Sequence, residues 1–452
     1  MSSSASTQLS RSDIPQRAIN VVVAGPESGK SLTALVPFTV EIRSISEGST
    51  PASYTFAASV SDNPIPAFTK QIELADPVAT LSLALNSHLL SNGSTQITFS
   101  VADEANREVW RNIVPLQIAN TGSLAETVRQ SLRRSKTPLF VEFCDSSQYD
   151  YSDESLKPWF DRDDALQHIE QRLLKREISP REAFLLQDFV LDGYIVMEDM
   201  LDDSLLEQIN REFDDAVAKK LEHREDGSSQ GIHNLHALYP GVRQLWKHPR
   251  ILRILSLIFE AHARPCQSLT YMFASQEDAH QDTVHLTAFP AGYMCGVWTA
   301  LEDIQVNSGE LELFKGTHRL PRVYMHDVRC SKVKSDSSEF RRKIVPVWRR
   351  MIQAGQFDKV VFRPKKGTVL IWHENLMYGT GIRIDTSVSR RSIMSHSFAD
   401  GAIAYSDSSG NVEYMEPLEN LRSSEHRNLR RFANSLAGRL PGFSPRVASM
   451  IT

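Results

Sequence analysis

Seven short runs of strand-forming residues lie within the first 120 residues, and they constrain the fold more than any other feature of the chain. Several alternate apolar and polar residues, as Phe38-Thr39-Val40-Glu41-Ile42 does, which is typical of a strand with one buried face. Turn-forming clusters such as Ser91-Asn92-Gly93-Ser94 separate the runs. The pattern predicts an immunoglobulin-like β-sandwich over residues 16–120, after a disordered N-terminus over residues 1–15. The runs are Ala18–Ala24, Phe38–Ile45, Tyr54–Val60, Gln71–Leu74, Ala79–Leu85, Gln96–Val101 and Ile113–Ile118.

One segment of this region fits a permissive phosphate-binding loop. From Ala24 to Ser31 the chain reads Ala-Gly-Pro-Glu-Ser-Gly-Lys-Ser after an apolar strand. Such a loop must lead into a helix whose N-terminus faces the phosphate. Pro37 follows soon afterwards and the sequence continues as an alternating run, so we predict an ordinary turn.

Helical periodicity replaces alternation beyond residue 120. Residues 121–160 are expected to be a linker to a second domain over residues 161–400, and residues 401–452 a helical extension. A capping box with proline at the first helical position, Ser179-Pro180-Arg181-Glu182, begins a helix that should end near Gly193. The other predicted helices cover Ser123–Arg134, Ala165–Arg176, Ser204 to about His223, and Leu418–Leu440, which is rich in arginine.

Composition narrows the functional classes. A chain of 452 residues is long enough for two or three domains, and its net charge of −5 attracts neither nucleic acid nor an anionic membrane. The four cysteines are far apart and lack C-x-x-C spacing, which argues against disulfides or structural zinc. No apolar run reaches membrane-spanning length, and the serine-rich start lacks the features of a signal peptide. We therefore expect a cytoplasmic protein with no membrane span and no nucleic-acid partner.

Strand signals return near residue 266, and roughly eight strands with long insertions suit a jelly-roll barrel, a double-stranded β-helix. The predicted fold class is therefore mainly β with flanking helices. Near the first of these strands lies His280-Gln281-Asp282. A His and an Asp two residues apart on a strand point to the same face, so both can coordinate one metal ion. With a second His they would form the two-His-one-carboxylate triad of non-haem Fe(II) oxygenases. The clearest of the predicted barrel strands are Ser268–Ala274, Met294–Ile304, Glu310–Phe314, Lys359–Arg363, Gly367–Trp372 and Arg391–Phe398.

The order of motifs from about Pro158 to Phe398 resembles the phytanoyl-CoA dioxygenase family of Fe(II)/2-oxoglutarate-dependent oxygenases. Gln276–Leu286 resembles the family's Q-x-x-H-Q-D segment, and Trp298–Asp303 resembles its W-x-A-L-x-D strand. The resemblance covers over half of the chain and leaves out the sandwich. Further matching segments are Pro158–Phe160, Phe189–Gly193, Ser308–Pro321 with its G-T-H-R-L-P turn, Gly367–Ile384 and Arg390–Ser392.

The resemblance implies Fe(II) as the metal, 2-oxoglutarate as the cosubstrate and O₂ as the oxidant. It makes His280 and Asp282 iron ligands at the catalytic centre. By motif, Arg390 holds the far carboxylate of 2-oxoglutarate, with Arg391 as the second choice, because a guanidinium fork binds a carboxylate bidentately. Two more residues are expected to line the cosubstrate cavity: Gln276 and Trp298.

The chain departs from the family at the distal histidine. Where the family reads L-x-H-G-G, this sequence reads Leu376-Met377-Tyr378-Gly379-Thr380-Gly381. A phenol, with a pKa near 10, binds Fe(II) poorly unless it is ionised. Three outcomes are open: Tyr378 ligates the metal or stands beside it, His373 or His396 substitutes for it, or the site no longer binds metal. In the last case the barrel would be a catalytically impaired binding or scaffold protein.

The sequence says less about partners. The expected substrate is a small organic molecule, free or linked to a carrier or a glycan. Self-association into a homo-oligomer would use the sandwich or the C-terminal helix.

Overall fold

The computed structural model describes residues 19–26, 30–44, 52–61, 68–198, 200–219, 221, 231–275, 277–417 and 420–421. These residues form two compact units. Unit 1 contains the described residues up to Asn120 together with Pro138–Phe143, and unit 2 contains Thr121–Thr137 and the described residues from Cys144 onwards. The predicted disordered N-terminus lies outside the described residues, as does the predicted helix Leu418–Leu440 apart from residues 420 and 421.

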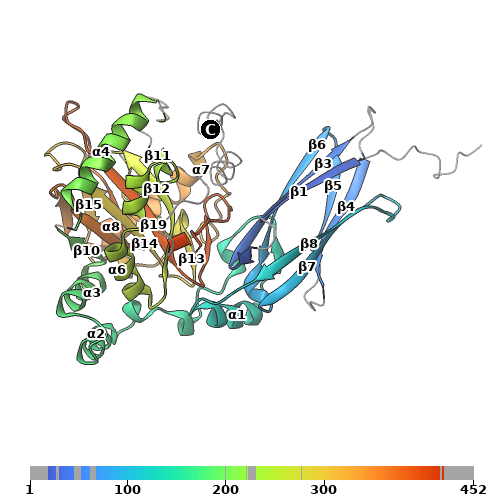
Figure 1. Ribbon diagram of the computed structural model, residues 1–452, viewed down its shortest axis with the longest axis horizontal. Coiled ribbons are helices and arrows are strands. Elements are labelled where there is room, and N and C mark those ends of the chain that lie inside the picture. The colour runs from blue at the N-terminus through green and yellow to red at the C-terminus, as the bar shows by residue number, and fades with distance from the viewer. Residues whose placement is uncertain are drawn as a thin grey trace, which may run out of the picture. The chain divides into compact units, whose positions relative to one another are not determined.

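Unit 1 consists of two packed β-sheets, with strand orders β1-β3-β6-β9 and β2-β8-β7-β4-β5 (Figure 1). The sheets pack face to face, since Phe38 of β3 and Phe99 of β7 have ring centroids 5.3 Å apart. All seven predicted runs form strands, because their alternate apolar residues point into this core. Its immunoglobulin-like class stays a prediction. The strands are β1 (Ile19–Ala24), β2 (Ser31–Leu32), β3 (Leu35–Ser44), β4 (Ala52–Val60), β5 (Phe68–Leu74), β6 (Val78–Asn86), β7 (Gly93–Ala102), β8 (Glu108–Ile118) and β9 (Phe140–Val141).

The permissive phosphate-binding segment leads into a strand. Ser31 and Leu32 form β2, which pairs in parallel with the end of β8 at Gln117 and Ile118. Between residues 30 and 44, all of which are described, the chain contains strands and no helix. The segment therefore lacks the helix N-terminus that phosphate binding requires.

The segment expected to be a linker is structured along most of its length. It contains helix α1 (Ala125–Arg134) and then β9, which pairs with β6 of unit 1 through Val141 and Ala84. Three 3₁₀ turns follow in unit 2: η2 (Ser146–Gln148), η3 (Glu154–Leu156) and η4 (Trp159–Asp161). A two-residue strand such as β9 is too short to produce a periodic sequence pattern, so its pairing could not be predicted.

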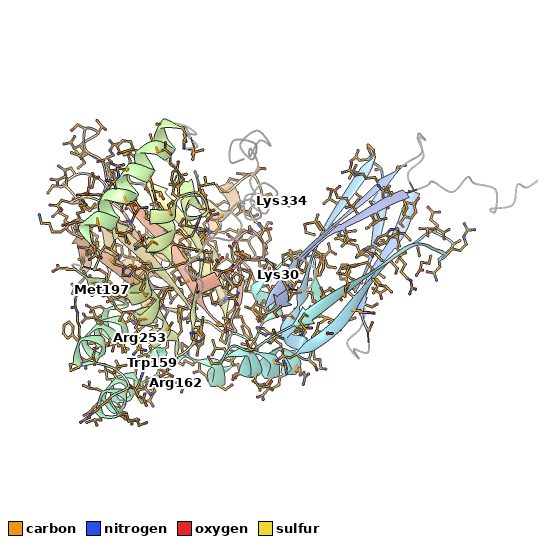
Figure 2. The ribbon with its side chains drawn as sticks, in the orientation of Figure 1. Lys30, Trp159, Arg162, Met197, Arg253 and Lys334 are labelled. Carbon is orange, nitrogen blue, oxygen red and sulfur yellow. The ribbon has the colours of Figure 1, made fainter. Side chains whose placement is uncertain are left out.

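Helices cover part of the barrel of unit 2. The predicted capping box is present at the start of α3, where the Ser179 hydroxyl accepts from the Glu182 amide, and Gly193 ends the helix with φ +86°. Trp159 of η4 donates its Nε1 proton to the carbonyl oxygen of Ile258 at 2.7 Å (Figure 2). The α-helices are α2 (Ala165–Leu174), α3 (Pro180–Asp192), α4 (Asp203–Ala218), α5 (Pro240–Trp246), α6 (Pro249–Phe259), α7 (Ser338–Lys343) and α8 (Val345–Gly355).

Two facing antiparallel sheets build the barrel. The larger has the order β10-β17-β14-β19-β12-β11 and the smaller the order β16-β15-β18, and a backbone bridge from His280 to Tyr378 extends the smaller sheet beyond β18. Buried side chains from both sheets, such as Trp298, Leu313 and Trp372, form one core cluster between them. From β14 to β19 the chain crosses repeatedly between the two sheets, as in the predicted jelly roll, while β13 and β20 pair in a separate two-stranded sheet. The strands are β10 (Tyr194–Met197), β11 (Ile232–His233), β12 (Ala263–Tyr271), β13 (Thr287–Phe289), β14 (Met294–Ala300), β15 (Leu311–Phe314), β16 (Lys359–Phe362), β17 (Val369–His373), β18 (Tyr378–Thr380), β19 (Ser392–Ala399) and β20 (Ile403–Tyr405).

The expectation that His280 and Asp282 share a regular strand is wrong. His280 forms an isolated bridge with Tyr378, and Asp282 begins a 3₁₀ turn, η6 (Asp282–Val284). Two backbone hydrogen bonds, His280 N to Tyr378 O at 2.9 Å and the reverse bond at 3.1 Å, hold the bridge.

Two global expectations can be compared with the structure. Among the described helices, none combines the length and apolar character needed to cross a membrane. All four cysteines are buried free thiols.

Candidate metal and cosubstrate site

The Asp282 carboxylate is the centre of the polar group inside the barrel. Its side chain is buried, and each oxygen accepts a hydrogen bond from an aromatic residue. Tyr378 donates its phenol proton to Oδ1 at 2.8 Å, and Trp372 donates its Nε1 proton to Oδ2 at 2.8 Å. These donors fix the plane of the carboxylate within the barrel.

Two imidazoles face the same carboxylate. His280 Nε2 lies 3.6 Å from Asp282 Oδ1, and His396 Nε2 lies 3.6 Å from Oδ2. His280 donates its Nδ1 proton to the carbonyl oxygen of Asp278 at 2.8 Å, and the Gln267 side chain lies 3.2 Å from His396 Nδ1. The Gln267 amide can present either its nitrogen or its oxygen to that ring, so both tautomers of His396 are accommodated. His396 Nε2 is buried and makes no hydrogen bond within the described part of the chain.

The electrostatics of the site favour charge separation. Burial alone would raise the pKa of Asp282, but the facing rings of His280 and His396 lower it well below its usual range. Burial alone would lower the pKa of His280, but Asp282 and Glu277 raise it to about 9. At neutral pH the two groups therefore form an imidazolium–carboxylate pair.

Tyr378 lies beside the ligand pair as a neutral phenol. Its ring centroid is 4.6 Å from that of His280 and 4.8 Å from that of Trp372. Burial and the negative charge of Asp282 raise the pKa of Tyr378 well above 10. The phenol therefore stays protonated and donates a hydrogen bond to Asp282. It does not offer a phenolate oxygen to a metal.

His373 does not reach this group. It follows Trp372 on β17, and neighbouring strand residues point to opposite faces of a sheet. Its Nε2 lies 3.2 Å from Asp161 Oδ1, and its Nδ1 accepts the backbone proton of Asn375 at 2.9 Å. The prediction that His373 could substitute as a metal ligand is therefore wrong, because its ring belongs to a separate cluster with Asp161.

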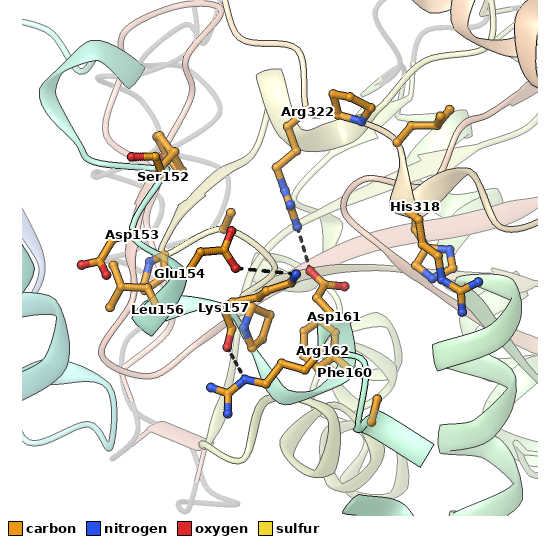
Figure 3. Close-up of a pocket in the computed structure, with 18 of the residues that line it drawn as sticks. Ser152, Asp153, Glu154, Leu156, Lys157, Phe160, Asp161, Arg162, His318 and Arg322 are labelled. Atoms are coloured by element: carbon orange, nitrogen blue, oxygen red, sulfur yellow. Dashed lines mark hydrogen bonds and ion pairs between the residues drawn. The ribbon is translucent and has the colours of Figure 1, made fainter. Parts of the chain in front are cut away.

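That cluster adjoins a surface cleft of about 980 Å³ (Figure 3). Asp161 and His318 are part of its wall, and Arg322 crosses it with one guanidinium nitrogen 3.2 Å from Asp161 and another 2.9 Å from Glu374. None of the residues that line it is His280, Asp282, His396 or Arg390. The cleft is thus not the mouth of the barrel site.

Arg390 is a buried guanidinium with few partners. Its Nη1 donates to the carbonyl oxygen of Gly309 at 3.1 Å, its Nε is buried without a partner among the described residues, and its Cζ lies 5.9 Å from the Trp298 ring centre. No carboxylate of the described residues lies within ion-pair distance of it, whereas Arg391 pairs with Asp214 at 2.5 Å. Burial lowers the pKa of Arg390 to about 10. Gln276 lies outside the described residues.

Three residues of the site were not singled out from the sequence. Trp372 and Asn375 belong to a motif that was noted only for the family resemblance, and Gln267 lies opposite His396 in the β12–β19 pairing. The Trp-His pair at the end of β17 was a usable signal for Trp372, since the residue before an outward His points inward. Gln267 had no local signal, because its role depends on the pairing of distant strands.

The side chains fit an iron ion in kind. Each imidazole aims Nε2 at the carboxylate while another group lies at its Nδ1, which is how metal-binding histidines are usually held. As they lie, no three His, Cys, Asp or Glu side chains of the described residues stand close enough together to hold an ion. Binding would therefore require the two imidazoles to close in on Asp282.

A family model agrees with the sequence resemblance over part of the chain. The family model described as phytanoyl-CoA dioxygenase (PhyH) matches residues 189–392. The similar solved structures include the non-heme alpha ketoglutarate dependent carbocyclase SnoK from nogalamycin biosynthesis, with 16% identity, 50% of this chain and 85% of that chain covered, and a TM-score of 0.41. EctD from S. alaskensis with bound Fe shows 20% identity, 49% and 77% coverage and a TM-score of 0.40. No curated protein sequence matches the chain. The matched segment runs from the end of α3 to the first residue of β19, so most of the barrel of unit 2 is similar to the phytanoyl-CoA dioxygenase family.

Proposed function

We propose that unit 2 is an Fe(II)/2-oxoglutarate-dependent oxygenase whose protein ligands are His280, Asp282 and His396. The observation that carries the proposal is that two imidazole Nε2 atoms face opposite oxygens of one buried carboxylate, each at 3.6 Å. Two nitrogens and one carboxylate are the ligand set of non-haem Fe(II) oxygenases. In this proposal His396, on β19, takes over from the distal histidine that the family places at the position of Tyr378.

Arg390 supports a dicarboxylate cosubstrate. A buried charge without a counter-ion costs several kcal/mol, so such a group is stabilised when an anion pairs with it. The far carboxylate of 2-oxoglutarate would supply that anion, with the Trp298 ring beside it. Gln276 as a further contact stays part of the proposal.

The roles of the other residues follow from their contacts. Bound iron would let O₂ oxidise 2-oxoglutarate to succinate and CO₂ while one oxygen atom hydroxylates an organic substrate. In the metal-free barrel Tyr378 and Trp372 orient the Asp282 carboxylate through their hydrogen bonds, and an ion bound to Oδ1 would take the place of the Tyr378 proton. The Asp278 carbonyl orients His280, and Gln267 orients His396. The substrate we propose is a small organic molecule, free or attached to a carrier or a glycan.

The test is iron binding by purified protein under anaerobic conditions, followed by succinate formation from 2-oxoglutarate in air with ascorbate. We expect a single iron per chain, lost in His280→Ala and in His396→Ala. His285→Ala is the matched control, because this neighbouring histidine is exposed and contacts Ser408 Oγ at 3.1 Å instead of Asp282. If His396→Ala still binds iron and Tyr378→Phe does not, the third ligand is Tyr378 and not His396. A wild-type protein that binds no iron would refute the proposal.

A metal-free binding or scaffold protein is the second candidate function. It is favoured by the Tyr378 proton, which already occupies Asp282 Oδ1, while Trp372 occupies Oδ2. This candidate predicts 2-oxoglutarate binding that is unchanged by a chelator and weakened in Arg390→Gln, with no succinate formed. Chelator-sensitive binding would exclude it.

A further inference from the structure

The turn between β17 and β18 contains a fully buried carboxamide, Asn375. Its Nδ2 donates to the carbonyl oxygens of His318 at 2.9 Å and Leu320 at 2.6 Å. Its Oδ1 accepts from the Gln281 amide at 2.7 Å and from the Thr283 hydroxyl at 3.4 Å. All four hydrogen-bonding positions of the side chain are therefore used, and they join three segments that are distant in the sequence.

The partner amide, Gln281, lies between the two proposed ligands in the sequence. It is fully buried, and its Nε2 also donates to the carbonyl oxygen of Pro321 at 3.1 Å. Its Oε1 accepts the indole proton of Trp348 at 3.0 Å. While His280 and Asp282 point at the metal site, Gln281 thus reaches away from it to Asn375, Pro321 and Trp348. A polar group buried this deeply is costly to leave unpaired, so the Gln281–Asn375 bond fixes the backbone between the two ligands.

The same turn also positions the opposite side of the site. Trp372, which bonds Asp282, lies three residues before Asn375, and Tyr378 lies three residues after it. The Thr283 hydroxyl shares its single proton between Asn375 Oδ1 and the backbone carbonyl of Glu374, which lies 3.2 Å away. One turn therefore carries both donors to the carboxylate and the clamp on the segment that supplies it.

We propose that Asn375 is a positioning residue for the metal site: its carboxamide clamps Gln281 and thereby sets the distance between His280, Asp282 and the β18 strand. The inference rests on the proposed function for its iron readout. The Asn375 side chain contacts neither the proposed ligands nor the cosubstrate pocket, so Asn375 acts through Gln281.

The test combines iron affinity with backbone amide exchange. Asn375→Ala should weaken Fe(II) binding by up to about tenfold, which is the loss of a single hydrogen bond converted to affinity. It should also speed hydrogen exchange at the His280 and Tyr378 amides, which bond to each other across the bridge. Gln281→Met keeps the length of the side chain without its amide and should do the same if Asn375→Ala does not fold.

Two further variants separate positioning from general stability. Asn120→Ala removes a buried carboxamide from unit 1, where its Nδ2 donates to Ser87 O at 2.8 Å and its Oδ1 accepts from the hydroxyls of Ser87 and Thr33, and should leave iron affinity unchanged. In the double variant of Gln281 and Asn375 the losses of iron affinity should not add, because both single changes break the same bond.

The outcomes distinguish the inference from the proposed function. Additive losses of iron affinity, or unchanged exchange at the His280 and Tyr378 amides, would overturn the positioning role of Asn375. If the wild type binds no iron, the proposed function fails, and the exchange measurement alone decides whether Asn375 holds the bridge.

Discussion

Removing the Tyr378 hydroxyl is the most informative single change, because it separates a ligand from a competitor. In the structure the phenol donates to Asp282 Oδ1 at 2.8 Å. An ion that binds through the lone pair of this oxygen that the phenol now uses must displace the phenol proton. Tyr378→Phe removes that competitor and keeps the ring, which makes tilted contacts with the rings of His280 and Trp372.

The size of the effect follows from the type of bond. A hydrogen bond to a charged group contributes about 1.5–3 kcal/mol, and about 1.4 kcal/mol corresponds to a tenfold change in affinity. We therefore expect Tyr378→Phe to bind Fe(II) about 10- to 100-fold more tightly than the wild type. The folded protein should lose stability in the absence of metal, by about 1–3 kcal/mol, because Asp282 loses a donor.

The assay is an anaerobic titration of Fe(II) against a competing chelator, together with urea unfolding of the metal-free protein. Tyr324→Phe is the matched control, since Tyr324 is buried in unit 2 and its hydroxyl makes no hydrogen bond among the described residues. Its iron affinity should equal that of the wild type. Weaker iron binding by Tyr378→Phe would contradict the role of the phenol as a competitor, because it would mean that the phenol oxygen helps to hold the ion.

Three other predictions follow from single groups in unit 2. Arg390→Lys should weaken 2-oxoglutarate binding, measured by calorimetry with Fe(II), about 10- to 100-fold, because lysine cannot reproduce the bidentate fork; unchanged affinity would exclude Arg390 as the clamp. Gly193→Ala should lower the free energy of unfolding by at least about 1–2 kcal/mol, since the residue has φ +86° and a Cβ would overlap His318 Nδ1; an equal urea midpoint would contradict this. Burial lowers the pKa of His236 and of His318 to about 3, so the unfolded chain binds protons below pH 6.5 that the native chain does not. The free energy of unfolding should therefore fall between pH 7 and pH 5, by up to about 1.4 kcal/mol per pH unit for each imidazole, and a flat urea midpoint would show that the two rings are not buried as neutral groups.

Local patterns predicted most of the described strands and the helices α1 to α4, but not α5 to α8, because the patterns depend on neighbours in sequence. The alternation in β3 and the capping box at Ser179 are each complete within a few residues, and both features are present. The position of Asp282 was mispredicted because a 3₁₀ turn interrupts the segment, and the His280 bridge has no extended pattern around it. The pairing of β9 with β6 was missed because it involves two residues.

The arrangement of the site could be predicted only in part. Because Arg390 and His396 are six residues apart, strand alternation predicts that they share a face, and both side chains are buried. It could not decide between His396, His373 and Tyr378, because that choice depends on which side chains from the two facing sheets meet at Asp282. The Gln281–Asn375 clamp was invisible for the same reason: its partners are 94 residues apart.

The charge on Asp282 links the two candidate functions. In the metal-free barrel the charge of the carboxylate is balanced by protonated His280, whose pKa is raised to about 9. Tyr378 and Trp372 add two hydrogen bonds from neutral donors. An ion would have to replace the His280 proton as well as the Tyr378 hydrogen bond, so protons and iron compete for His280 Nε2 and Asp282 Oδ1. A histidine in place of Tyr378 would lack the phenol that reaches Asp282 Oδ1. The substitution at this position therefore stabilises the metal-free barrel while leaving His280, Asp282 and His396 in place, and the strength of iron binding depends on how much the phenol bond to Asp282 contributes.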